Sequence, residues 1–410
     1  MAVAIIHYAS APVIGGVETT IAQHARFLTS VGYSVRIISG RGGVTDPRFH
    51  TIIDPLFGSS DAQILDIKRE LDVGRVTDAF TAFAERIEMA LRAALAGVEV
   101  CIVHNVHTMH KNLAFTAALH RISAEANAPR MIAWCHDLAW TNPLYAAELH
   151  AGYPYELLRT IWKRTRYVTV SEARQEEAAE MFGVPRESIQ VIPPGVDLAQ
   201  FFHWTDTTEK IVDRFRLLDA YGIFLLPARL TRRKNIALAL QIMAEMRRQS
   251  GHDYRLIVTG PPGPHNPANP GYLGELLALC ESLGLSESAH FLYQLDDPPL
   301  IPDDDTMSNL YQIADALIFP STQEGFGIPL LEAGIAGLPI FCADIPPFRQ
   351  IGGSDVTFFD PVNDPPKTIA RQIIHHLETD ATARMRARVR RDYRWDSIVR
   401  RLILPLLEGV

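Results

Sequence analysis

Apolar positions along the chain fall into two alternating patterns. Short runs rich in β-branched residues predict the strands of the first half, which are Val3–His7, Ser34–Ser39, Val98–His104, Arg130–Cys135 and Tyr167–Ser171. Longer stretches such as Val17–Val31 and Thr77–Gly97 carry apolar residues at helical spacing. Mostly apolar strands that alternate with amphipathic helices predict a parallel sheet covered by helices on both faces.

The second half of the chain repeats this alternation. Its predicted strands are Gly222–Pro227, Arg255–Thr259, His290–Leu292, Ala316–Phe319, Pro339–Ala343 and Thr357–Phe359. Its predicted helices include Ala237–Gln249, Tyr272–Leu283 and Met307–Ala314. The sequence therefore predicts an α/β protein with two Rossmann-like, doubly wound parallel-sheet domains that face a cleft. A turn and a polar stretch interrupt the pattern within Ile192–Thr208, so we expect domains at residues 1–205 and 206–385, followed by a final segment at residues 386–410.

Composition narrows the class of protein. Among 410 residues, 47% are hydrophobic and 21% charged, which is ordinary for a soluble globular chain. The net charge of −8 argues against a protein that binds nucleic acid through phosphate contacts. The four cysteines show no CxxC spacing and predict reduced thiols in a cytoplasmic protein. The N-terminus resembles a first strand more than a signal peptide, and no apolar run approaches the ~20 residues that span a bilayer.

A glycine-rich turn after the predicted strand Ala316–Phe319 is the most informative segment. Gly325 and Gly327 allow a ligand to approach the backbone, and the helix that begins near Pro329 presents free N–H groups to an anion. Glu324 and Glu332 stand on either side of this turn, and carboxylates accept paired hydrogen bonds from vicinal hydroxyls. A turn followed by a glutamate that complements the helix dipole would also explain part of the pattern. The Glu-x7-Glu spacing favours a binding site.

The same segment, EGFGIPLLE, resembles the signature of a large family of retaining glycosyltransferases. This is glycosyltransferase family 4, or glycosyl transferases group 1, which contains sucrose synthases, glycogen synthase relatives and bacterial mannosyltransferases. The resemblance extends through almost the whole chain. It implies the GT-B fold, with a first domain that binds the acceptor, a second that binds a nucleotide sugar, and a final helix that returns to the first.

The resemblance also implies roles for residues in the second half. Arg229 and Lys234 match the family's pair that neutralises the donor diphosphate, and charge of this kind stabilises a departing nucleotide. Their neighbours Arg232 and Arg233 are interpreted as a solvated turn. Glu324 and the backbone of Gly325, Phe326 and Gly327 would hold the sugar hydroxyls, and Glu332 would bind the ribose. The proline-rich loop that begins at Gly260 and runs to residue 267 is expected to contact the base or ribose.

In the first half, Gly15 and Gly16 resemble the family's GG-x-E loop, whose backbone contacts the donor phosphate and sugar. A glycine pair after a strand also suits a simple turn. His136 matches the histidine that lies near the hydroxymethyl group of the donor sugar, with Asp137 orienting it or adding a hydroxyl contact. A histidine that ends a strand serves equally well as a cap for local backbone.

Three further patterns are interpreted as structural. His104, His107 and His110 lack the acidic or thiolate neighbours of a metal site. The run Asp303–Asp305 precedes a helix, for which Asp305 or Thr306 would be the N-cap. The eight arginines from Arg384 to Arg401 are interpreted as a solvated helix face beside a packed Trp395, while peripheral membrane contact stays open as the alternative.

The resemblance, together with these residues, implies a retaining transferase that moves a hexose from a nucleotide diphosphate sugar, of the GDP-mannose or UDP-glucose type, to a hydroxyl acceptor. The resemblance implies no cofactor and no obligatory metal, with closure of the domains around the donor. Because no residue is a convincing covalent nucleophile, we favour a front-face route in which the leaving phosphate takes the acceptor proton. A sugar phosphorylase, a nucleotide-sugar hydrolase or epimerase, and a non-catalytic nucleotide-sugar-binding subunit are the alternatives. The intact Arg229, Lys234, Glu324 and Glu332 argue against the last of these.

Overall fold

The computed structural model describes residues 1–263 and 269–409. Within these residues the chain divides into two compact units. The first unit comprises Met1–Gly195 together with the chain from Trp395 onward, and the second comprises Val196–Arg394. The final segment of the chain therefore belongs to the unit in which the chain begins.

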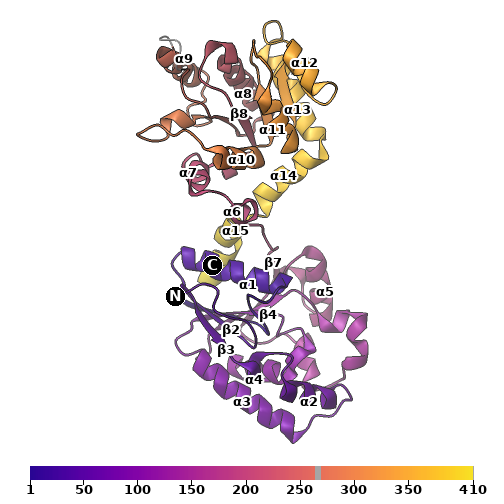
Figure 1. Cartoon of the computed structure of the whole chain (residues 1–410). Coiled ribbons are helices and arrows are strands. Elements are labelled where there is room, and N and C mark those ends of the chain that lie inside the picture. The colour runs from indigo at the N-terminus through magenta and orange to yellow at the C-terminus, as the bar shows by residue number, and fades with distance from the viewer. Residues whose placement is uncertain (264–268, 410) are drawn as a thin grey trace. The chain divides into compact units, whose positions relative to one another are not determined.

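A parallel sheet forms the centre of the first unit (Figure 1). Its strands are β1 (Ala2–Ile6), β2 (Ser34–Ser39), β3 (His50–Ile53), β4 (Val100–His104), β5 (Arg130–Cys135), β6 (Thr165–Thr169) and β7 (Ile189–Val191). They are arranged in the order β3-β2-β1-β4-β5-β6-β7, so the direction of strand order reverses between β1 and β4. Connections of this kind require helices on both faces of the sheet.

Helices cover both faces of this sheet because successive side chains of each strand point to opposite sides. The helices of the unit include α1 (Gly16–Ser30), α2 (Ala62–Leu71), α3 (Asp78–Ala94), α4 (Leu113–Ser123), α5 (Glu172–Phe182), α15 (Trp395–Ile398) and α16 (Leu404–Glu408). Ala4 and Ile6 of β1 pack into the core beneath α2, α3 and α4. Val3 and Ile5 face the core formed with α1 and the C-terminal helices, in which Trp395 is buried as the sequence predicts.

The second unit repeats the architecture. Its strands are β8 (Gly222–Leu226), β9 (Tyr254–Val258), β10 (Ala289–Phe291), β11 (Ala316–Phe319), β12 (Ile340–Ala343) and β13 (Thr357–Phe359), all parallel, in the order β10-β9-β8-β11-β12-β13. Its helices include α6 (Leu198–Phe202), α7 (Asp206–Arg214), α8 (Ile236–Ser250), α9 (Asn269–Ser282), α10 (Asp304–Ile313), α11 (Ile328–Ile335), α12 (Pro346–Gly352), α13 (Pro366–Thr379) and α14 (Ala381–Asp392). The predicted α/β class with two Rossmann-like sheets is confirmed.

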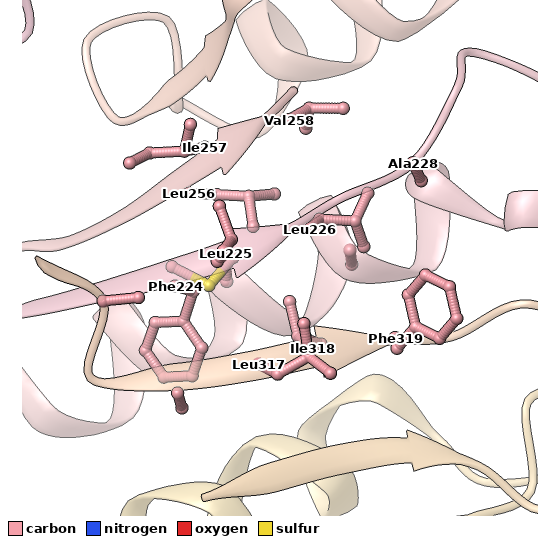
Figure 2. Packing of buried hydrophobic residues seen from close by; sticks show 14 of the residues in the cluster. Phe224, Leu225, Leu226, Ala228, Leu256, Ile257, Val258, Leu317, Ile318 and Phe319 are labelled. Atoms are coloured by element: carbon pink, nitrogen blue, oxygen red, sulfur yellow. The ribbon is translucent and has the colours of Figure 1, made fainter. Parts of the chain in front are cut away.

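The central strands of the second unit are apolar on both faces. Figure 2 shows Phe224, Leu225 and Leu226 of β8 between the side chains of β9 and β11. These side chains are fully buried. Because β8 and β11 are parallel neighbours, with Leu225 opposite Leu317, their carboxyl ends lie at the same edge of the sheet. The loops that follow the two strands consequently leave the same edge of the sheet side by side.

Local signals decide several details of the second unit. Asp303 is the N-cap of α10, because its Oδ1 accepts a hydrogen bond from the backbone N–H of Thr306 at 2.9 Å. The expectation of a cap is therefore right, but the capping residue is Asp303 rather than Asp305 or Thr306.

The four cysteines of the chain are free and buried.

The arginines of α14 are not a solvated face throughout, so that interpretation is wrong. Arg390 is buried, and its Nη1 lies 2.7 Å from Oδ2 of Asp315, directly before β11. Its Nη2 donates to the carbonyl of Tyr221 at 2.6 Å, and Asp315 in turn accepts from the backbone N–H of Ile223 at 2.7 Å. Arg386 donates to two further carbonyls of the same unit, those of Gln312 and Ala314, each at 2.7 Å. These bonds attach α14 to the starts of β8 and β11.

Replacing Arg390 tests this attachment. Arg390→Met leaves the buried Asp315 carboxylate without its main cation, so we expect a loss of about 3 kcal/mol in the free energy of unfolding. Arg388 lies exposed on the same helix, and Arg388→Met is the matched control, with an expected change within about 0.5 kcal/mol. Denaturant unfolding followed by circular dichroism measures both. Equal midpoints for the two variants would contradict the assignment.

Candidate functional site

The strand order of the second unit reverses between β8 and β11. Ligands of open parallel sheets bind beyond the carboxyl ends of the strands at such a point. The loop after β8 runs through Arg229 and Lys234 to Asn235, where α8 begins after a residue in the left-handed conformation (φ 52°). Asparagine tolerates this conformation better than most residues, which explains its place there. The loop after β11 carries Glu324 and the glycine-rich turn.

The structure brings Lys234 and Glu324 together. The Lys234 ammonium forms an ion pair with Oε1 of Glu324 and also lies 4.9 Å from the centre of the Phe319 ring. Both side chains are mostly enclosed, with exposed fractions of 12% for Lys234 and 11% for Glu324. Two residues that are 90 positions apart in sequence therefore form one charged centre at the carboxyl ends of β8 and β11.

Arg233 is the second cation at this centre. Its Nη1 donates to Oε2 of Glu324 at 3.0 Å and to the carbonyl of Gln323 at 2.9 Å. Its own carbonyl accepts from the backbone N–H of Thr322 at 2.9 Å. The interpretation of Arg233 as a merely solvated turn residue is therefore wrong. For Arg232 it fits better, because that side chain is 66% exposed and pairs with Glu275 at the periphery.

The two cations determine the charge state of Glu324. Burial alone would raise the pKa of this carboxyl group. The hydrogen bond and the charge of Lys234 outweigh burial, and the pKa of Glu324 lies below its ordinary value. Glu324 is therefore an anion at neutral pH.

Arg229 and Gly260 lie on adjacent loops of the same edge. The Arg229 side chain is exposed, and within the described residues it has no acidic partner. Gly260 follows β9, and a Cβ there would fall 2.5 Å from the carbonyl oxygen of Ala228 and 2.7 Å from Cα of Arg229. Glycine is required at this position because the loop residues that directly follow β8 and β9 are in contact. The rest of the predicted loop, residues 264–267, lies outside the described residues.

The turn Gly325–Phe326–Gly327 uses its two glycines differently. Gly327 is the N-cap of α11 with φ 131°, a conformation that other residues rarely adopt, and a Cβ there would fall 2.9 Å from the ring of the buried Phe348. Gly325 is open to solvent, and a Cβ there would meet nothing within 4 Å. The Phe326 side chain is half exposed. Gly325 therefore leaves the backbone of the turn accessible to solvent, whereas Gly327 allows the backbone conformation with which α11 begins.

Glu332 lies on the exposed face of α11, and within the described part of the chain Tyr311 is its hydrogen-bond partner. The hydroxyl of Tyr311, on α10, donates to its Oε2 at 2.5 Å. Burial, followed by the hydrogen bond and the charge of Glu332, raises the pKa of Tyr311. Tyr311 thereby fixes the orientation of the carboxylate while its other oxygen stays available.

In the first unit, His136 directly follows β5 and is bound by residues at the end of β4. Its Nε2 shares a hydrogen bond of 2.9 Å with Nδ1 of the fully buried His104. Its backbone N–H donates to Oδ1 of Asn105 at 2.8 Å, and that of Asp137 donates to the same oxygen at 3.2 Å. Asn105, in a left-handed conformation, therefore caps the turn that carries His136.

His136 is partly buried and lies against a group of three buried imidazoles, those of His7, His24 and His104. Burial lowers the pKa of His24 and of His136 to about 3, and it lowers the pKa of His7 and His104 as well. The Nδ1 of His7 donates to the carbonyl of His104 at 2.9 Å. The group is therefore neutral at physiological pH, and His136 offers a hydrogen-bonding nitrogen rather than a positive charge.

Gly15 and Gly16 lie at the start of α1, after β1. Gly15 is the N-cap in an extended conformation, and a Cβ at Gly16 would meet nothing within 4 Å. Glu18 lies in the first turn of the same helix, with Oε2 2.1 Å from where a Gly15 Cβ would be. The role of this helix start as a contact for the donor stays a prediction.

Two family models divide the chain between them. The model described as Glycosyltransferase Family 4 matches residues 14–200, and the model described as Glycosyl transferases group 1 matches residues 208–392. The chain belongs to this glycosyltransferase family. The second model covers the loops that carry Lys234 and Glu324, and the first covers His136.

Two proteins described as glycosyltransferases match parts of the chain. An uncharacterized glycosyltransferase of Methanocaldococcus jannaschii is 28% identical over 210 residues, which are 51% of this chain and 49% of that protein. The D-inositol 3-phosphate glycosyltransferase of Nocardia farcinica is 32% identical over 180 residues, which are 43% of this chain and 36% of that protein. The chain thus spans half or less of the length of these relatives.

A solved glycosyltransferase structure from Rickettsia africae also matches, with 18% sequence identity and a TM-score of 0.37. The match covers 99% of this chain and 97% of that one. Membership of the family rests on the matches to the two family models and not on this structural comparison.

The histidine run after β4 does not converge on a metal. His104 contacts His136, His107 packs against Trp162 with ring centres 4.1 Å apart, and Nε2 of His110 lies 2.8 Å from Glu148. Among the residues that the structure describes, no three His, Cys, Asp or Glu side chains form a group that could hold a metal ion. Over the same residues, no helix has the length and apolar character needed to cross a membrane.

The two glycines of the turn predict different tolerance to a methyl group. Gly327→Ala places a Cβ against Phe348 at a strained φ, so we expect a loss of about 2 kcal/mol in the free energy of unfolding. Gly325→Ala is the matched variant and should change stability by less than about 0.5 kcal/mol. Denaturant unfolding of both proteins makes the comparison. A Gly327→Ala protein as stable as Gly325→Ala would refute the packing argument.

The neutral imidazoles predict a loss of stability in acid. The pKa of His24 lies at about 3 in the folded protein and near 6.5 when unfolded, so below pH 6.5 the unfolded chain binds more protons. Each such group therefore lowers the free energy of unfolding by about 1.4 kcal/mol per pH unit as the pH falls from 6.5 toward 3. His24→Phe keeps the aromatic contact with Trp134 and should flatten this dependence by about one such slope.

Unfolding experiments between pH 4 and 7 test this expectation. His50→Gln, on the exposed strand position of β3, is the control for loss of a histidine as such. An unchanged pH dependence in His24→Phe would mean that His24 is protonated in the folded protein.

Proposed function

We propose that this chain is a retaining glycosyltransferase that transfers a hexose from a nucleotide diphosphate sugar to a hydroxyl acceptor. The observation that carries the proposal is the charged centre at the carboxyl ends of β8 and β11. There, Lys234 and Arg233 flank Glu324, and the exposed Arg229 lies on the same loop as Lys234. Cations suit a diphosphate, and an anionic carboxylate suits sugar hydroxyls.

Each residue receives a role in this proposal. Arg229 and Lys234 bind the diphosphate and stabilise the charge that develops as the nucleotide leaves. Glu324 and the accessible backbone of Gly325, Phe326 and Gly327 bind hydroxyls of the hexose, and Glu332, oriented by Tyr311, binds the ribose. Gly260 keeps its loop close to Arg229 and permits contact with the nucleotide.

The first unit supplies further hydrogen bonds to substrate. Gly15 and Gly16 offer backbone N–H groups at the start of α1. His136, held through its Nε2 by His104, offers its other ring nitrogen to a sugar hydroxyl. The low pKa of His136 supports a neutral hydrogen-bonding role over that of an acid catalyst.

The environment of Glu324 supports the front-face route to retention. Double displacement needs a carboxylate free to attack the anomeric carbon. Glu324 is instead paired with both Lys234 and Arg233, which lowers its nucleophilicity and fixes its orientation. In the front-face route, the bond from the anomeric carbon to the phosphate oxygen breaks. The acceptor oxygen then bonds to that carbon from the same side, and its proton passes to the leaving phosphate. No metal or cofactor is required in this proposal.

Binding and turnover test the proposal in that order. Thermal-shift measurements against UDP-, GDP- and ADP-sugars identify the donor, including the expected GDP-mannose and UDP-glucose types, and acceptor trials follow with that donor. The anomeric configuration of the product, determined by NMR, tests retention. Stabilisation by no activated sugar would refute the proposal, and an inverted product would refute the mechanism.

Removal of one cation gives the sharper prediction. Lys234→Ala should lower kcat/KM by about 10²–10³-fold, because the leaving diphosphate loses a positioned charge. Arg229→Ala should lower turnover in the same direction. Lys367→Ala removes an exposed lysine from α13 and should leave turnover unchanged. Turnover equal to wild type in both Lys234→Ala and Arg229→Ala, with the fold intact, would remove the diphosphate assignment.

A further inference from the structure

Arg233 has no assigned role, although it contacts the same carboxylate as Lys234. The Glu324 side chain is only 11% exposed, and each of its two oxygens faces a different cation. Oε1 pairs with Lys234 and Oε2 with Nη1 of Arg233. An enclosed carboxylate needs at least one such partner to remain charged at low energetic cost.

The charges at this centre do not cancel. Two cations and one anion, each carrying a unit charge, leave a net charge of +1. Without Arg233, Lys234 and Glu324 would form a neutral pair. To bind an anion, Lys234 would have to break its ion pair, and the Glu324 carboxylate would then have no cation beside it. With Arg233, Lys234 can turn to a diphosphate while Glu324 keeps a partner.

We propose that Arg233 is a positioning residue that holds the Glu324 carboxylate and thereby releases Lys234 for the diphosphate of the donor. This inference rests on the function proposed above and adds to it a residue that acts through Glu324. The side chain of Arg233 is 50% exposed, which suits a supporting cation at the rim of the centre better than one that is enclosed by the nucleotide.

The backbone around Arg233 makes the side chain removable. The carbonyl of Arg233 accepts from the backbone N–H of Thr322 at 2.9 Å and from the Thr322 hydroxyl at 3.2 Å. These bonds join the loops after β8 and β11 without the guanidinium group. Arg233→Ala therefore retains the backbone contact between the two loops and removes the guanidinium group, with its bonds to Glu324 and to the carbonyl of Gln323.

Arg232 is the matched control. It is the preceding residue and carries the same charge, but it pairs with Glu275 at 2.6 Å and lies over the Tyr272 ring, 4.9 Å from its centre. Arg232→Ala changes the net charge of the protein by the same amount as Arg233→Ala. The two variants therefore separate a local role from a general electrostatic effect.

Calorimetric titration with UDP, GDP and ADP tests the inference in the intact chain. For the nucleotide that binds best, Arg233→Ala should weaken affinity on the order of tenfold, and Arg232→Ala by less than about twofold. In a Glu324→Gln background, Lys234 has no carboxylate to leave, so Arg233→Ala should weaken affinity by less than about threefold. Arg233→Lys should restore part of the affinity, because it restores a cation beside Oε2.

The outcomes are distinguishable. An equal loss from Arg233→Ala in both backgrounds would mean that Arg233 acts on the nucleotide directly, and no loss in either would mean that it has no role; both results overturn the inference. Binding of none of the three nucleotides by the wild-type protein would overturn the proposed function, and the inference with it. As a ligand-free check, carbon-13 NMR should find a higher pKa for Glu324 in Arg233→Ala than in Arg232→Ala.

Discussion

A carboxylate held by two cations joins the loops on which the second unit's site depends. Glu324 contributes from the turn after β11, and Lys234 and Arg233 contribute from the loop after β8. The loop after β8 is bridged on one side to the loop after β9, through Leu230 and Pro262. The ion pairs and the bond between Thr322 and Arg233 join it on the other side to the loop after β11. The buried strands β8 and β11 determine where the two loops leave the sheet. The charged side chains determine how the loops lie against each other beyond it. The relative position of these two loops therefore depends on an electrostatic contact as well as on packing.

Much of the fold follows from local pattern. Ser34–Ser39, Arg130–Cys135 and Ala316–Phe319 coincide with observed strands, because each carries several apolar residues and lies between two neighbouring strands of its sheet. The edge strands β3 (His50–Ile53) and β7 (Ile189–Val191) are not predicted, because each is short and includes polar residues. The buried arginines of α14 are also missed, since their partners Asp315 and Tyr221 lie far away in sequence.

The candidate site is predicted in part for the same reason. The sequence points to Lys234 and Glu324 through the motifs around them, and the structure places them in contact. It does not point to Arg233, whose partner lies 91 positions away and whose neighbours suggest only a charged turn. His104 and Asn105 are missed as supports of His136 because strand β5 must lie beside β4 before they can meet. Contacts between loops from different strands require knowledge of the strand order.

The way in which the chain is divided between the two units affects the order in which these units can fold during synthesis. The second unit is an insertion within the first, since the chain leaves the first unit after Gly195 and rejoins it at Trp395. The sheet face that carries Val3 and Ile5 is covered partly by Trp395 and the residues that follow it. A nascent chain can therefore close the second unit before the first, because this face of β1 is not fully covered until the helices that begin at Trp395 have been synthesised. Until then, the apolar face of β1 that carries Val3 and Ile5 stays partly exposed to water.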